Sequence, residues 1–176
     1  MNLSVSHPLQ GEAQAVIGGL DRGLLTHANV NPDTGLATDY LNHFNEAIML
    51  LEMLAMAPDC IEDFLEWRPM NYVEHFTESN YTHRDVAIAA YDAANPIARM
   101  SLDQLTERMT GVLVFTRDAM RSGLSPETAV SLAERVAAAL KPLVARAGAI
   151  INGTATADDE TAALAPQAAV DALMAG

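Results

Sequence analysis

The chain has 176 residues, of which 23 are Asp or Glu and 10 are Lys or Arg, giving a formal net charge of −13. This length suits one compact domain, and a hydrophobic share of 50% is enough to bury a core. The negative charge argues against a nucleic acid or an anionic membrane as the main partner, because both attract basic surfaces.

Cysteine content and hydropathy narrow the class of protein further. The single cysteine, Cys60, excludes an intrachain disulfide and a cysteine-based zinc site. Residues 1–8 do not resemble a signal peptide, and no run of 18 apolar residues occurs. We therefore expect a cytoplasmic protein that does not enter a membrane.

The charge is unevenly distributed along the chain. Residues 31–100 hold 12 acidic and 3 basic side chains, a net −9, whereas residues 101–153 have a net charge of +1. The same 31–100 segment contains eight of the nine aromatic residues and three of the five histidines. A binding site or a partner-binding face is therefore predicted within this segment.

Helical periodicity begins near the N-terminus. The apolar residues of the first predicted helix recur every three or four positions: Leu9, Ala13, Val16, Leu20 and Leu24. Gly18 and Gly19 weaken this helix, because glycine is a poor helix former. Residues 32–35 then predict a turn.

The second predicted helix has the same spacing over a longer stretch, at Leu36, Tyr40, Phe44, Ile48, Leu51 and Ala55. Met49, Met53 and Met56 lie off this stripe, so the C-terminal half of the helix is apolar nearly all round. Such a helix is expected either at the centre of a fold or in an oligomer interface.

Three short helices are predicted between Pro58 and Ala94. Each begins with an N-cap residue and an acidic residue three positions later, in the pairs Asp59 with Glu62, Asn71 with Glu74, and Thr82 with Asp85. Pro58 ends the second helix and Pro69 ends the first short one.

Two longer helices follow. One starts at Ser101 and ends at Gly123, and the other starts at Ser125 and runs to Asn152 and Gly153. Pro142 predicts a kink or a break inside the last helix. Short connections favour antiparallel neighbours.

The predicted fold is all-α, a helical bundle of about four longer helices with a cluster of short helices between the second and third. Residues 1–153 form the single domain. Residues 154–176 are rich in alanine and poor in large side chains, so they predict a weakly docked or frayed C-terminal tail.

The best candidate site is a polar face of the second helix. Asp39, His43 and Glu46 are spaced i, i+4 and i+7, so their side chains project from one face. Two carboxylates and an imidazole are suitable ligands for one divalent metal ion, or an acid–base pair for a small ligand. Glu74, His75 and His83 could complete such a site if their segment folds over the second helix. The alternative is an ordinary helical ion pair with a solvated face.

No phosphate loop, dinucleotide fingerprint or nucleophile elbow appears in the sequence. The leading hypothesis is therefore a homodimeric accessory or regulatory protein that acts by association, without catalysis and without a required cofactor. One alternative is a bundle that binds a divalent metal or small ligand at Asp39/His43/Glu46, either as an enzyme or as a binding protein. Another is an acidic decoy, whose partner is a protein with a basic surface.

Overall fold

The computed structural model describes residues 17–155, and within this range the regular structure is helical, apart from two isolated β-bridges. The helices are α1 (Arg22–His27), α2 (Leu41–Met56), α3 (Ile61–Glu66), α4 (Tyr72–Glu78), α5 (Arg84–Asp92), α6 (Pro96–Arg121) and α7 (Pro126–Ile151), with 3₁₀ turns η1 (Thr38–Tyr40) and η2 (Pro58–Cys60). The all-α prediction is confirmed.

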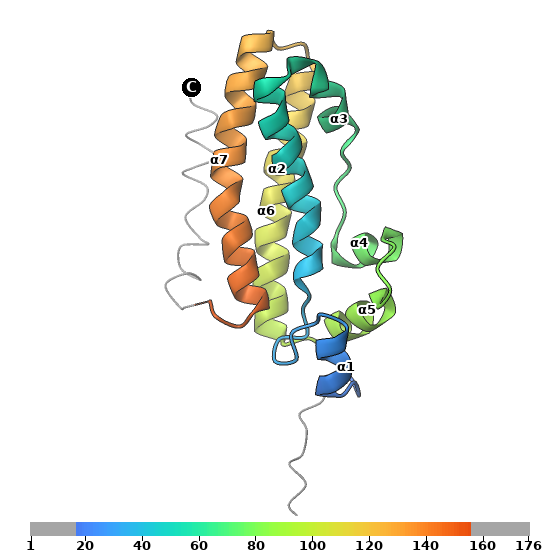
Figure 1. Ribbon diagram of the computed structural model, residues 1–176. Coiled ribbons are helices and arrows are strands. Elements are labelled where there is room, and N and C mark those ends of the chain that lie inside the picture. The colour runs from blue at the N-terminus through green and yellow to red at the C-terminus, as the bar shows by residue number, and fades with distance from the viewer. Residues whose placement is uncertain (1–16, 156–176) are drawn as a thin grey trace, which may run out of the picture.

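The three long helices α2, α6 and α7 form a bundle, with the shorter helices along one side and one end of it (Figure 1). Helices α2 and α6 run in the same direction, and α7 runs opposite to both and packs against each (Figure 1). Residues 57–95 return the chain from the end of α2 to the start of α6, and we call this segment the crossover. The expected antiparallel packing therefore holds for α7 but not for α2 with α6.

The first predicted helix is wrong over residues 17–21, and only its end at Leu24 lies in a helix. Residues 17–20 form a tight turn closed by an Ile17–Leu20 bridge, with Gly18 and Gly19 at φ of 57° and 81°. The helix starts only at Arg22, where the Asp21 side chain accepts a hydrogen bond from the backbone N–H of Leu24. The described chain thus has three long helices, because two adjacent glycines favour the turn over the helix. Residues 9–16 of that prediction, and the predicted tail from residue 156 onward, lie outside the described range.

Capping predictions succeed where the side-chain bonds form. Asn71 and Glu74 make a complete capping box at α4, and Ser125 caps α7 ahead of Pro126. By contrast, Thr82 does not cap α5, whose N-cap is His83 without a side-chain bond, and Asp59 belongs to the 3₁₀ turn that precedes α3. These two starts are set by the preceding turns.

Two long-helix boundaries also differ from expectation. Helix α6 starts at Pro96, five residues before Ser101, because the Asn95 side chain accepts from the N–H groups of Ile97 and Ala98. Helix α7 continues through Pro142, so the predicted break does not occur. Pro142 is exposed, which places its ring and its missing hydrogen bond on the solvent face.

The predicted turn at residues 32–35 connects several elements. Gly35 has φ of 78°, and a Cβ there would lie 2.9 Å from the Cα of Ala94. The buried Thr34 hydroxyl donates to the carbonyl of Ile151 at 2.6 Å, and the Thr34 carbonyl accepts from Asn95 N–H. This turn therefore links the end of the crossover to the end of α7.

The core is aliphatic inside the bundle and aromatic toward the crossover. Phe44, Phe64 and Phe76 are among its fully buried side chains, together with Leu51, Leu113 and Leu140. None of the helices within residues 17–155 combines the length and apolar character that a membrane crossing requires.

Candidate functional site

His43 lies on α2 and is only 2% exposed. Its Nε2 accepts a hydrogen bond from the backbone N–H of Met70 at 3.2 Å, and its ring stacks on Trp67 with 4.8 Å between centroids. The Trp67 indole N–H donates back to the His43 carbonyl at 3.4 Å. His43 therefore holds the extended part of the crossover, residues 67–71, against α2.

These contacts assign a neutral imidazole to His43. Because Nε2 accepts a hydrogen bond, the ring proton belongs on Nδ1, which is buried and has no partner among the described residues. Burial, with a smaller contribution from His75, lowers the pKa of His43 to about 4. One ring nitrogen is already bonded to the backbone, so the histidine predicted as a ligand has a structural role here.

His75 is the second histidine of this region, and it is half-buried. Its ring centroid lies 6.2 Å from that of His43 and 5.7 Å from that of Tyr40. Burial lowers the pKa of His75, while the nearby carboxylates of Asp39 and Glu46 act in the opposite direction. The structure thus brings Asp39, His43 and His75 into one neighbourhood, with the exposed Glu46 at its edge.

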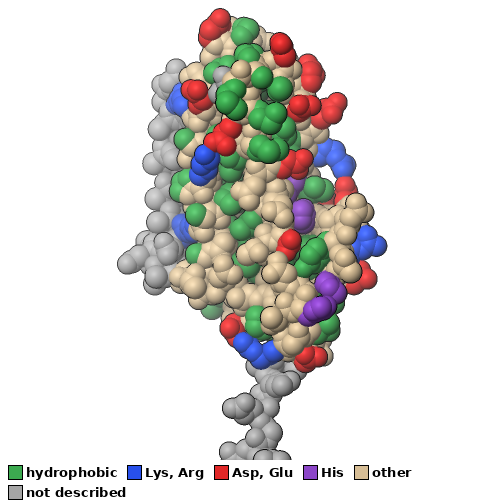
Figure 2. Space-filling model, in the orientation of Figure 1, with side chains coloured by type: hydrophobic (Ala, Val, Ile, Leu, Met, Phe, Trp, Pro, Cys, Tyr) green, Lys and Arg blue, Asp and Glu red, His purple; other side chains and the backbone are tan. Residues whose placement is uncertain are grey.

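His83 lies elsewhere. Its ring packs edge-on against His27 of α1 at 4.8 Å, at the start of α5. Figure 2 shows histidine side chains gathered at two separate places on this face of the molecule.

Asp39 accepts a hydrogen bond from the Asn29 side chain at 2.7 Å. Within residues 17–155, no three His, Cys, Asp or Glu side chains are arranged to hold a metal ion together. A divalent metal ion therefore stays a prediction from sequence spacing.

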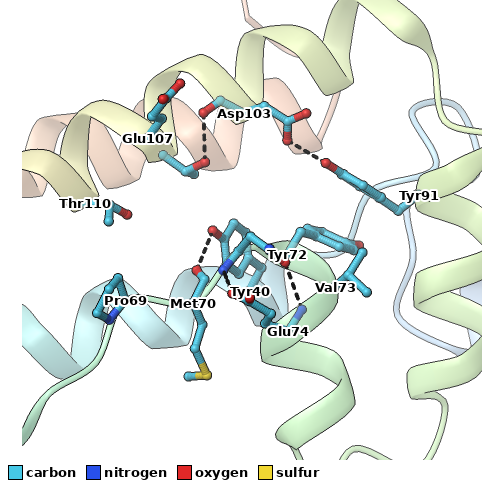
Figure 3. A pocket seen from close by; sticks show the side chains of 12 residues that line it. Tyr40, Pro69, Met70, Tyr72, Val73, Glu74, Tyr91, Asp103, Glu107 and Thr110 are labelled. Atoms are coloured by element: carbon cyan, nitrogen blue, oxygen red, sulfur yellow. Dashed lines mark hydrogen bonds between the residues drawn. The ribbon is translucent and has the colours of Figure 1, made fainter.

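A hollow lies between the crossover and α6, and we call it the α6 groove. Its volume is about 680 Å³. Asp103, Thr106, Glu107 and Thr110 of α6 line one side, and residues 69–74 with Tyr40 and Tyr91 line the other (Figure 3). The groove exists because the crossover runs beside α6 without packing closely against this part of it.

Three tyrosines form the wall opposite α6, and hydrogen bonds fix each of them. Tyr40 donates to the Met70 carbonyl at 3.0 Å, Tyr72 accepts from Ala37 N–H at 2.9 Å, and Tyr91 donates to Asp103 at 2.8 Å. The rings of Tyr72 and Tyr91 stack with their centroids 4.4 Å apart. Burial raises the pKa of Tyr40 and of Tyr91 to about 12, so both phenols are neutral near pH 7.

The charged side chains that line the groove are all acidic: Glu74, Asp103 and Glu107. Glu74 uses one oxygen in the α4 capping box, and Asp103 accepts from Tyr91. A second hollow of about 500 Å³ lies next along α6 and shares Asp103 and Glu107 with the groove. Two adjacent hollows therefore meet at a pair of carboxylates one helical turn apart.

Sequence reasoning missed the α6 half of this site. The segment it selected, residues 31–100, contributes Tyr40, Tyr72, Glu74 and Tyr91, but Asp103 and Glu107 fall in the near-neutral segment that follows. The i, i+4 spacing of those two carboxylates is a visible signal, although it is common on solvated helices. Asp103 and Glu107 line a groove only because the crossover passes beside this part of α6.

Comparisons of the chain with protein-family models, with curated protein sequences and with solved structures found no match. The chemistry of the site therefore rests on the residues themselves.

Proposed function

We propose that this protein acts by binding rather than by catalysis, and that the α6 groove binds a positively charged group of a small molecule or protein partner. The observation that carries the proposal is the lining of the groove, which among residues 17–155 combines three carboxylates and three tyrosines with no basic side chain. The proposal keeps the accessory role expected from the sequence and adds a specific binding site for the partner.

The size and charge of the groove support the proposal. A volume of about 680 Å³ lies within the range of roughly 300–1,000 Å³ that is usual for ligand sites. Carboxylates at a partly enclosed surface attract cations, and tyrosine rings add a favourable apolar and π surface.

The state of the phenols favours binding over a reaction. The tyrosine hydroxyls are occupied by hydrogen bonds, and the pKa of both Tyr40 and Tyr91 is raised to about 12. A general base works best when its pKa is near the working pH. These groups therefore suit a rigid wall better than proton transfer.

The test is an NMR titration of the full chain with spermidine at low ionic strength. We expect shifts confined to residues 69–74, 91 and 103–110, which weaken as salt is added. Glu107→Gln is expected to weaken binding about fivefold, the effect of losing roughly 1 kcal/mol from an exposed charge pair.

Glu134→Gln is the matched control, because Glu134 is an exposed glutamate on α7 outside the groove. It should leave the spermidine affinity unchanged. Equal weakening by both variants, or shifts spread over the whole acidic surface, would overturn the proposed site.

Self-association through the end of α2 is a second candidate, favoured by the exposure of its methionines. Met49 and Met56 are 51% and 81% exposed, and Figure 2 shows hydrophobic side chains gathered toward the end of the bundle where α2 ends. Flexible methionine side chains suit adaptable interfaces.

Light scattering on a sizing column tests this second candidate. A dimer would have twice the chain mass of 18.8 kDa, and the double variant Met49→Glu with Met56→Glu should return it to a monomer. Phe115→Glu is the control, because Phe115 is also 51% exposed but lies on α6. A wild-type protein that stays monomeric at every concentration would refute the dimer.

A further inference from the structure

Among the described residues, Arg99 is the one basic side chain that lines the two adjoining hollows, and it occupies a defined cation position. Its guanidinium carbon lies 4.7 Å from the centroid of the Tyr91 ring, and its Nε lies 4.0 Å from Asp103 Oδ2. Its Nη1 donates to the carbonyls of Tyr91 and Asp92, at 3.3 Å each. An aromatic face, a carboxylate and two carbonyls thus surround one guanidinium.

Tyr91 is therefore enclosed on two sides. Tyr72 stacks nearly parallel to its ring, with 13° between the planes, and Arg99 lies over the ring as well. The Tyr91 hydroxyl donates to Asp103. The stacking on Tyr72 and the bond to Asp103 fix the Tyr91 ring without any help from Arg99. The position that Arg99 fills is therefore formed by the fold itself.

The acceptors around this position suit a guanidinium better than an ammonium. A guanidinium is planar, stacks on aromatic rings and presents several N–H donors in a fixed fork. The carbonyls of Tyr91 and Asp92 belong to the last turn of α5. The Tyr91 carbonyl also accepts from the backbone N–H of Ala94 at 3.2 Å, so Arg99 shares this acceptor with the end of the helix. The guanidinium carbon over the Tyr91 ring and two carbonyls that accept from Nη1 suit such a group.

Arg99 can leave this position at low cost. Its side chain is 41% exposed, and Asp103 is 44% exposed. Ion pairs at such exposed positions contribute only about 0–1 kcal/mol. A competing guanidinium would then make the same contacts that Arg99 gives up, while the Arg99 side chain moves into solvent.

We infer that the cationic group bound here is a guanidinium, and that Arg99 holds its position while the ligand is absent. This inference rests on the proposed function of the α6 groove. The ligand guanidinium takes the place of Arg99 beside Tyr91 and Asp103, and the rest of the ligand extends past Glu107 into the α6 groove. Arg99 is a specificity-determining residue in this scheme, because only a group that makes its contacts replaces it well.

The test compares butylguanidinium with pentylammonium by NMR titration of wild-type protein and of Arg99→Ala. Removing an internal competitor that fills the site about nine-tenths of the time raises the apparent affinity about tenfold. We therefore expect Arg99→Ala to bind butylguanidinium about tenfold more tightly, with shifts at residues 91, 92 and 103 and a smaller gain for pentylammonium. Asp103→Asn added to Arg99→Ala should abolish the gain.

Arg121→Ala is the matched control. It removes the same charge from the same helix, and Arg121 is 51% exposed, but its guanidinium donates to the Leu65 carbonyl, away from the hollows. If Arg121→Ala strengthens binding as much as Arg99→Ala, the effect is one of net charge and the inference is wrong. Unchanged far-UV circular dichroism and melting temperature verify that each variant is folded.

The two proposals fail in different ways. If pentylammonium binds as tightly as butylguanidinium in both proteins, the cation site stands and the guanidinium preference is refuted. If neither compound nor spermidine shifts the groove residues, the proposed function is also refuted. Acetyl-Gly-Arg-Gly-amide and its lysine counterpart identify the source: tighter binding of the arginine peptide than of butylguanidinium indicates a protein side chain, and the reverse indicates a small molecule.

Discussion

The bundle and the crossover are held together by different kinds of interaction. The bundle buries periodic aliphatic stripes, such as Leu113 on α6 and Leu140 on α7. The short helices of the crossover bury single aromatic side chains such as Phe64 and Phe76. Its extended part, residues 67–71, is attached through individual polar contacts: Met70 N–H to His43, Tyr40 to the Met70 carbonyl, and Arg117 to the Trp67 carbonyl. Distributed packing resists local opening, whereas a few directed bonds permit it. The candidate site therefore lies where a rigid helix meets a segment that can adjust.

This comparison predicts that bundle variants affect the whole molecule. Leu140→Ala removes a side chain that is 1% exposed, and we expect it to reduce the free energy of unfolding by about 2–5 kcal/mol. Native-state hydrogen exchange should show protection falling in the bundle and the crossover together. Leu143→Ala, a partly buried neighbour on the same helix, should cost less. Selective loss of protection in α7 alone would contradict a single cooperative bundle.

The crossover is expected to respond to pH through His43. Its pKa is lowered to about 4 in the folded chain, against about 6.5 in an unfolded chain. The unfolded state therefore binds this proton first, so stability is complete above pH 6.5 and falls as the pH drops toward 4. Since one pKa unit corresponds to about 1.4 kcal/mol, the full loss is on the order of 3 kcal/mol. His75, whose pKa burial also lowers, adds a loss of the same sign.

Urea unfolding at pH 7.5, 5.5 and 4.5 measures this loss, and His43→Phe isolates it. The variant is less stable at pH 7.5 because Met70 N–H loses its acceptor. Its free energy of unfolding should nevertheless change less between pH 6.5 and 4.5 than that of the wild-type protein. The difference between the two pH profiles removes the contribution of the carboxylates, which both proteins share. Parallel curves for the two proteins would refute the assignment of the loss to His43.

The same contrast explains what could be predicted from the sequence. The long helices α2, α6 and α7 follow from apolar spacing and caps such as Ser125, since these signals are local. Of the predicted polar face, His43 and Glu46 lie on α2, whereas Asp39 lies in η1, and the chemistry of these residues depends on which segment covers them. No local signal states that Met70 N–H will take His43 Nε2, or that Asp103 will face Tyr91. Such contacts depend on the path of the crossover. That path is set by contacts between residues far apart in the sequence, which form only in the folded chain.

The smallest predicted effect concerns the tyrosine wall of the α6 groove. Tyr72→Phe keeps the ring that stacks on Tyr91 but removes the oxygen that accepts from the buried Ala37 N–H. An unpaired buried donor costs about 1–3 kcal/mol, and we expect the lower part of this range because the ring packing is retained. Hydrogen exchange should locate the loss at Ala37 and the start of α4, while protection in α7 changes little. Tyr40→Phe, whose carbonyl partner Met70 is partly exposed, should cost less. If Tyr72→Phe instead lowers protection equally in α7, the wall belongs to the cooperative bundle, and the groove is a rigid cleft on both sides.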